Sequence, residues 1–188
     1  DFAPSEIRDI FPSNTPKRTI LSFNSDFEIV PNSAAPTTPP SKFLYGHTPT
    51  WEDLAGDLDI GREVTQKIIT DIELNLNNPA PPSHLMLLSE EIGSGKTTTL
   101  RRIAFELSKR GYIVLNCSAL SRIEPLSTAD TIDLIDKPVV IVVDNFADQA
   151  TSIGDILQSI EKKDIIFLGT ERKYRQRYIE STISGTKI

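Results

Sequence analysis

Four short apolar runs place the strongest constraint on the fold of this sequence. They span residues 85–89, 112–116, 139–143 and 165–168, and longer segments with helical spacing separate them. The runs are almost continuously apolar, whereas strands with one solvated face alternate between apolar and polar residues. Strands without that alternation are buried on both faces, as in a parallel sheet covered by crossover helices. The runs therefore predict an α/β fold.

Helices are predicted between these runs. Apolar residues recur at helical spacing over 62–76, 97–109 and 153–160. Helices that connect parallel strands pack on both sides of the sheet, which makes a three-layer α/β/α arrangement. The chain has 188 residues, enough for one domain of this kind.

The first 50 residues have a different composition. The tract 31–40 contains four prolines and has no apolar face to bury. We therefore interpret residues 1–50 as an extended, proline-rich linker or the tail of an upstream domain, and 51–188 as the folded domain. Within the first part, the apolar segments 19–23 and 26–30 are interpreted as a short hairpin or the end of a preceding domain.

Composition excludes several classes of protein. The 26 acidic residues outnumber the 20 basic ones, and a net charge of −6 disfavours non-specific capture of nucleic acid. One cysteine and two histidines cannot build a disulfide scaffold or a four-ligand zinc site. The sequence has no apolar run of about 18–20 residues and no secretory leader, so we expect a cytoplasmic protein without a membrane partner. We also expect a piece of a longer polypeptide, truncated on its C-terminal side.

A candidate phosphate-binding loop follows the first apolar run and precedes a predicted helix. Such a loop wraps phosphate oxygens with main-chain N–H groups at a helix N-terminus. The residues that would form it are Gly93, Ser94, Gly95, Lys96, Thr97 and Thr98. Lys96 would neutralise the β and γ phosphates, and the Thr97 hydroxyl would coordinate Mg²⁺. The loop predicts a nucleotide and Mg²⁺ as cofactors.

The loop departs from the full phosphate-loop pattern at its start. The pattern places a glycine at position 90, where this chain has Glu90, and Glu91 follows. Two carboxylates close to a polyanion either weaken nucleotide binding or point outward without effect. Both alternatives stay open from the sequence.

The third apolar run, 139–143, ends in Asp144 and Asn145. A carboxylate at the C-terminal end of a strand that neighbours the phosphate-loop strand reaches the water shell of Mg²⁺, so Asp144 is the second predicted magnesium residue. In hydrolysing proteins of this design, the next position is often a glutamate that polarises the attacking water. The amide of Asn145 cannot accept that proton. We therefore expect slow turnover or a switch that holds its nucleotide.

The last apolar run is followed by polar residues. Thr170 and Arg172 are expected beside the γ-phosphate, where Arg172 would sense or stabilise its charge. Residues 172–178 mix four basic side chains with two tyrosines. This patch predicts either a solvated helix face or a contact with nucleic acid, and the first interpretation is preferred.

Taken in order, the segments 93–98, 139–144 and 167–172 resemble the nucleotide-binding domain of the STAND branch of AAA+-related P-loop ATPases. The resemblance covers about residues 52–188. It implies the P-loop NTPase fold, ATP as the nucleotide, and a Walker B strand (139–143) beside the phosphate-loop, or Walker A, strand.

The resemblance also assigns roles to two arginines. In this family, a Thr-Thr-Arg-like signature contacts the γ-phosphate through its arginine, and Thr170-Glu171-Arg172 matches its first and last positions. The segment before the first helix lines the adenine pocket, which here is the segment 59–62, ending at Arg62.

The resemblance implies a larger sensor protein. STAND proteins commonly carry an effector domain on the N-terminal side, which the proline-rich tract would tether, and bacterial defence proteins share this layout. The implied function is an ATP-driven switch that self-associates through its NTPase domain. Two alternatives stay open: a DNA-handling ATPase that uses the patch 172–178, and a scaffold that has lost nucleotide binding, which Glu90 and Asn145 motivate.

Overall fold

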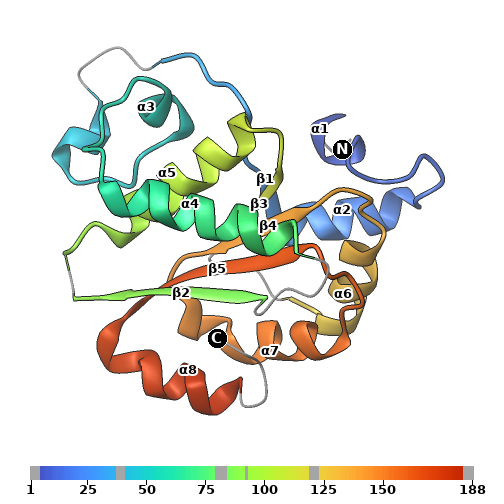
Figure 1. Ribbon diagram of the computed structural model, residues 1–188. Coiled ribbons are helices and arrows are strands. Elements are labelled where there is room, and N and C mark those ends of the chain that lie inside the picture. The colour runs from blue at the N-terminus through green and yellow to red at the C-terminus, as the bar shows by residue number, and fades with distance from the viewer. Residues whose placement is uncertain (1–4, 37–40, 79–83, 92, 119–122, 184–188) are drawn as a thin grey trace.

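A five-stranded sheet forms the centre of the protein (Figure 1). A computed structural model describes residues 5–36, 41–78, 84–91, 93–118 and 123–183. The strand order is β1-β3-β4-β5-β2, and every neighbouring pair is parallel except β1 and β3. The strands are β1 (Phe27–Ile29), β2 (Leu85–Glu90), β3 (Ile113–Cys117), β4 (Val139–Val143) and β5 (Ile165–Arg172). The four predicted apolar runs are the four parallel strands.

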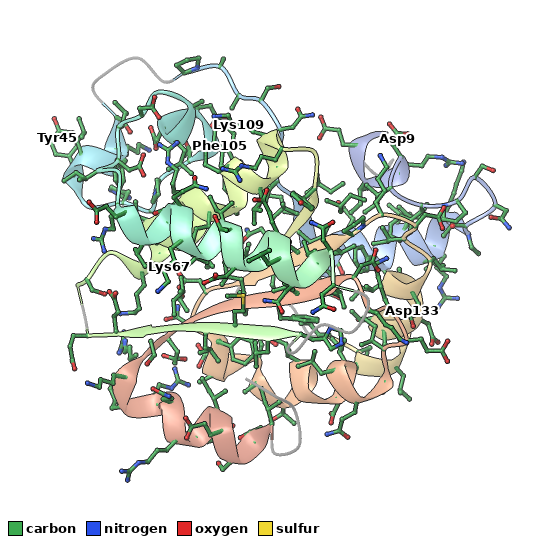
Figure 2. All side chains as sticks on the ribbon, in the orientation of Figure 1. Asp9, Tyr45, Lys67, Phe105, Lys109 and Asp133 are labelled. Atoms are coloured by element: carbon green, nitrogen blue, oxygen red, sulfur yellow. The ribbon has the colours of Figure 1, made fainter. Side chains whose placement is uncertain are left out.

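Helices cover both faces of this sheet, which confirms the three-layer α/β/α fold (Figure 1). One face is covered by α3 (Trp51–Ala55), α4 (Glu63–Leu76) and α5 (Lys96–Lys109). The other face is covered by α1 (Ser5–Arg8), α2 (Lys17–Asp26), α6 (Pro125–Asp133), α7 (Ala150–Ser159) and α8 (Gln176–Thr182). Apolar side chains fill both layers, as Figure 2 shows.

Strand β5 contributes side chains to the apolar cores on both faces of the sheet. Ile165 and Phe167 pack toward α7 and α8, whereas Ile166 and Leu168 pack toward α4 and α5. All four side chains are almost inaccessible to solvent. This two-faced burial explains why the strands lack alternation, because side chains that point to opposite faces are equally buried.

The predicted neighbour of the phosphate-loop strand is wrong. We expected β4, the strand that ends before Asp144, to lie beside β2, but β5 lies between them and pairs with both. The exposure of the strands explains this order. The eight residues of β5 are buried up to Glu171, whereas most of β2 is only partly buried and suits an edge. As a result, β5 separates the strand that leads into the phosphate loop from the strand that ends before Asp144.

The hairpin predicted over residues 19–30 is also wrong. Residues 17–26 form α2, and only 27–29 form a strand, which pairs with β3. Ile20 and Phe23, three residues apart on one face of α2, are buried together with Phe27 at the start of β1. The described part of residues 5–30 thus packs on the sheet.

The proline-rich tract follows these elements. Its residues 31–36 have neither helix nor strand structure, and 37–40 lie outside the described residues. The boundary that we place between residues 50 and 51 stays a prediction.

Candidate nucleotide-binding site

The predicted phosphate loop joins β2 to α5, at the C-terminal edge of the sheet. Gly93 and Gly95 have φ angles of 78° and 80°, a region that glycine adopts without steric cost. Gly95 precedes the first residue of α5, and its carbonyl accepts a hydrogen bond from Thr99 N at 3.0 Å. Because the first N–H groups of a helix have no intrahelical partner, this end of α5 suits an anion. Ile92, in the same loop, lies outside the described residues.

Lys96 is held by the loop itself. Its Nζ donates to the carbonyl oxygens of Glu91 and Glu90 at 2.6 and 3.1 Å, and to Ser94 Oγ at 3.3 Å. Both glutamate side chains are exposed. Glu90, which stands where the phosphate-loop pattern has a glycine, thus contributes its main-chain carbonyl to Lys96. Its exposed side chain fits the alternative in which the carboxylate points outward.

Asp144 connects three elements at the sheet edge. Its Oδ2 accepts from Thr97 Oγ1, the hydroxyl at the start of α5, at 2.8 Å. Its Oδ1 accepts from Thr170 Oγ1 at the end of β5, and from Asn145 N at 3.1 Å. The predicted magnesium residues Thr97 and Asp144 are therefore in direct contact, and Thr170 shares their carboxylate. Hydroxyl and carboxylate oxygens are the ligand types that Mg²⁺ prefers.

Asn145 has a left-handed backbone, with φ of 51° and ψ of 55°. Asparagine tolerates this conformation better than most residues with a side chain. Its N–H donates to Asp144 while its side chain is exposed. The residue thus contributes to the site through its backbone, which turns the chain directly after Asp144.

Arg172 lies at the same edge as the phosphate loop. It pairs in register with Glu90, because the ends of β5 and β2 are neighbours. Its side chain is exposed, and its Nη1 donates to Tyr174 Oη at 3.3 Å. Contact between Arg172 and a γ-phosphate stays a prediction.

Arg62 lies against the phosphate loop, although it is distant in sequence. A Cβ placed on Gly95 would be 2.5 Å from Arg62 Nη2. A cavity of about 390 Å³ adjoins this arginine, and it is lined by Asp57, Asp59, Gly61, Arg62, Thr65, Gln66, Ile69, Arg102 and Glu106. The segment assigned to adenine by resemblance thus borders a cavity next to the loop. Its role in binding a base stays a prediction.

Arg102 fastens this segment to α5. It forms ion pairs with Asp59 and, at 3.2 Å, with Asp57 and Glu106. The hydrogen bond to Asp59 is the main cause that raises the pKa of the Arg102 guanidinium above its ordinary value. The wall of the cavity is therefore held in place by a charged group that stays ionised.

Glu171 is the residue of the site that sequence reasoning missed. Only 1% of its surface is exposed. Its carboxylate accepts from the main-chain N–H groups of Ala147, at 2.8 Å, and Arg172, at 2.7 Å. Arg175 Nη1 lies 3.5 Å from it. The available signal was a glutamate at the end of a buried strand with an arginine four residues later.

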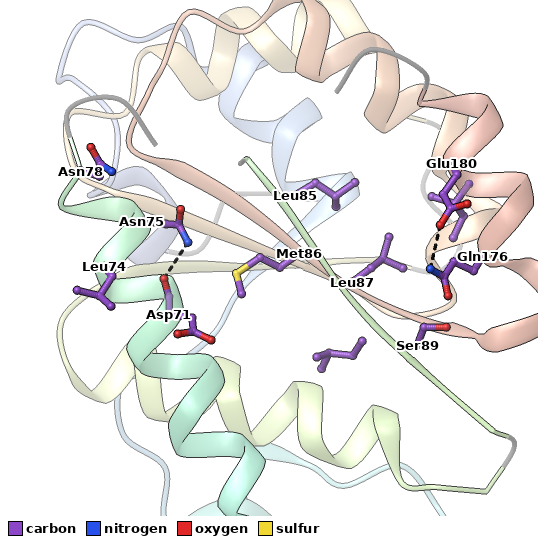
Figure 3. Close-up of a pocket in the computed structure, with 12 residues that line it drawn as sticks. Asp71, Leu74, Asn75, Asn78, Leu85, Met86, Leu87, Ser89, Gln176 and Glu180 are labelled. Atoms are coloured by element: carbon purple, nitrogen blue, oxygen red, sulfur yellow. Dashed lines mark hydrogen bonds between the residues drawn. The ribbon is translucent and has the colours of Figure 1, made fainter. Parts of the chain in front are cut away.

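A larger cavity of about 600 Å³ runs along the outer edge of β2, between α4 and α8 (Figure 3). Leu85 to Ser89 line it, together with residues such as Asp71, Asn75 and Glu180. Asn75 Oδ1 and Ser89 Oγ are buried there without a hydrogen-bond partner among the described residues. None of the predicted site residues lines this cavity.

Two other features are absent from the described ranges. Within them, no group of three His, Cys, Asp or Glu side chains is placed to hold a metal ion. None of the helices in the same part of the chain is long and apolar enough to cross a membrane.

The comparison with protein families agrees with this fold. Residues 41–184 match the family described as Novel STAND NTPase 5, and the match covers more than half of the chain. No curated protein matches the chain. Among solved structures, C. elegans PCH-2 is similar at 17% identity and a TM-score of 0.47, over 65% of this chain and 41% of that chain. The chain belongs to the Novel STAND NTPase 5 family.

Proposed function

We propose that this NTPase domain is an ATP-dependent switch, which binds ATP with Mg²⁺ at the edge formed by the loop 93–98 and Asp144. The observation that carries the proposal is the shared carboxylate of Asp144. It receives hydrogen bonds from Thr97 of the phosphate loop and from Thr170 of β5. A ligand that binds at this carboxylate therefore acts on α5, β4 and β5 together.

Each group around the edge has a chemical role in this proposal. The loop N–H groups and the positive end of α5 bind phosphate oxygens. Lys96 exchanges its carbonyl partners for the β and γ phosphates. Thr97 and Asp144 would hold the magnesium ion through their hydroxyl and carboxylate oxygens. When bound, the ion neutralises phosphate charge and orients the phosphate chain.

Slow hydrolysis follows from Asn145 in this proposal. An amide cannot accept a proton from an attacking water, and the side chain is exposed rather than held toward the edge. A domain that hydrolyses slowly keeps its nucleotide, and differential binding to two arrangements is what a switch requires. The nucleotide state then controls self-association of the domain in the cytoplasm, and through it an effector in the same polypeptide.

A nucleic-acid function has weaker support. The patch 172–178 contains Arg175, which pairs with Asp148 at 2.7 Å and lies 3.5 Å from Glu171. Because its guanidinium already faces two carboxylates, Arg175 is poorly placed to neutralise a backbone phosphate. The chain as a whole carries a net charge of −6.

The proposal is tested by the magnesium dependence of ATP binding. Titration calorimetry of the wild type with ATP is expected to show tighter binding with Mg²⁺ than with EDTA. Thr97→Val removes the hydroxyl and keeps the shape, so the gain from Mg²⁺ should fall by roughly 10-fold or more. Thr70→Val, which changes an exposed threonine of α4 outside the proposed site, is the matched control and should keep that gain. A wild type that binds no ATP under either condition would favour the scaffold alternative.

Hydrolysis provides a second test, at Asn145. Asn145→Glu supplies a carboxylate at the position after Asp144, so we expect the rate of ATP hydrolysis to rise by about 10²-fold, the lower range for a general base. Asn145→Gln is the control, because glutamine matches glutamate in length and occupies the same left-handed position but supplies no base. A steady-state phosphate-release assay compares the three proteins. Equal rates for the two variants would mean that turnover is limited elsewhere.

A further inference from the structure

Two residues at the end of β5 form hydrogen bonds to the turn that follows Asp144. Thr170 and Glu171 are consecutive, so their side chains point to opposite faces of the sheet. Thr170 donates to the carboxylate of Asp144, and Glu171 accepts from the N–H of Ala147. The segment from Asp144 to Ala147 is therefore fastened at both of its ends.

The middle of this turn would not stay in place without such contacts. Asn145 has a left-handed backbone, which is unfavourable for a residue with a side chain, and its N–H donates to Asp144 Oδ1. A change of this conformation would rotate Asp144 away from Thr97. The hydrogen bond from Ala147 N to Glu171 restrains the turn from the far end.

The carboxylate of Glu171 is suited to this task by its burial and its partners. With 1% of its surface exposed, it faces two N–H donors and the guanidinium of Arg175. Arg175 also pairs with Asp148, three residues beyond the left-handed Asn145, and this hydrogen bond raises the pKa of Arg175 above its ordinary value. A buried carboxylate with such partners gives strong, directional hydrogen bonds.

We propose that Glu171 is a positioning residue, which fixes the turn 144–147 so that Asp144 keeps its carboxylate toward Thr97 and the magnesium site. The proposal rests on the proposed function for the identity of the ligand. It explains why a glutamate occupies the middle of the Thr170-Glu171-Arg172 signature. A neutral side chain at this position offers one oxygen acceptor at most, where two main-chain donors converge.

Amide hydrogen exchange of the nucleotide-free chain tests the positioning directly. In Glu171→Gln, the N–H groups of Ala147 and Arg172 should exchange about tenfold faster than in the wild type, because charged hydrogen bonds become neutral or are lost. The matched control is Asp53→Asn, which alters another buried carboxylate that accepts from a main-chain N–H, in the capping box of α3. It should leave exchange at Ala147 unchanged.

Calorimetry with ATP connects this effect to the site. The gain in ATP affinity from Mg²⁺ should fall by about tenfold in Glu171→Gln, in the range found for residues that orient metal ligands. Asp53→Asn should keep the wild-type gain. Glu171→Asp, which keeps the charge but is one methylene too short, should show the same loss as the glutamine variant, and it replaces that variant if the latter does not fold.

A double variant separates positioning from general loss of stability. In an Asp144→Asn background, Glu171→Gln should cause no further loss of the Mg²⁺ gain, because both changes act on one carboxylate. Additive losses would overturn the proposal, as would unchanged exchange at Ala147. If the wild type does not bind ATP, or if Lys96→Ala leaves its ATP affinity unchanged, the proposed function fails. The exchange experiment needs no nucleotide, so it still decides whether Glu171 holds the turn.

Discussion

Replacing Lys96 with alanine is expected to weaken ATP binding by at least about 100-fold, or about 2.7 kcal/mol. The reason is the loss of the only ammonium group in the loop 93–98. That group is held within the loop by three oxygen atoms, the nearest at 2.6 Å, and is proposed to move to the β and γ phosphates. Titration calorimetry with ATP and Mg²⁺ measures the change in Kd.

The matched control for this experiment is Lys67→Ala. Lys67 is an exposed lysine on α4, and it is labelled in Figure 2. This variant should bind ATP within about twofold of the wild type, because an exposed charge outside the loop 93–98 is largely screened by salt. Circular dichroism should report the same folded structure for both variants. If Lys96→Ala keeps the wild-type Kd, the loop 93–98 is not the phosphate site.

Replacing Gly169 with alanine should lower the free energy of unfolding by about 1–3 kcal/mol. A Cβ at this position would lie 2.5 Å from Cδ2 and 2.9 Å from Cγ of Phe146. Phe146 is fully buried, and its ring cannot move away without disturbing its neighbours. Because Gly169 directly precedes Thr170 and Phe146 follows Asn145, the same clash would displace the edge of the site. Urea unfolding measures the change in stability.

The same substitution at Gly154 should have the opposite sign. Gly154 lies inside α7, and a Cβ there would be 3.6 Å from Ile183 Cγ1, an ordinary contact. Alanine is favoured over glycine in a helix, so Gly154→Ala should raise the free energy of unfolding by about 0.5–1 kcal/mol. A Gly169→Ala protein as stable as the wild type would show that Phe146 repacks freely.

The phosphate loop and its flanking elements could be predicted because their signals are local. The apolar run 85–89 and the helical spacing over 97–109 are properties of neighbouring residues, and they lie within one or two residues of β2 and α5. One further step placed Thr97 and Asp144 at the same predicted magnesium site, and the structure adds the direct hydrogen bond between them. The C-terminal ends of parallel strands meet at one edge of the sheet, so polar residues after two such strands lie close together.

Helix α2 was missed because its local sequence fits two structures. The separations from Ile20 to Phe23 and Phe27 fit a helix, but short apolar groups on either side of Asn24 and Ser25 also fit a hairpin. Packing of these side chains against the sheet favours the helix. Local sequence carries no information on that packing.

The amino-acid sequence by itself determined the layered α/β fold and predicted the loop 93–98, since each depends on residues that are close in the chain or on a general rule of parallel sheets. Only the tertiary structure decided that β5 lies between β2 and β4. That order brings Thr170 to Asp144 and Glu171 to Ala147. Strand order depends on how whole strands compete for the buried centre of the sheet, and this competition is settled by packing across the molecule rather than by local pattern.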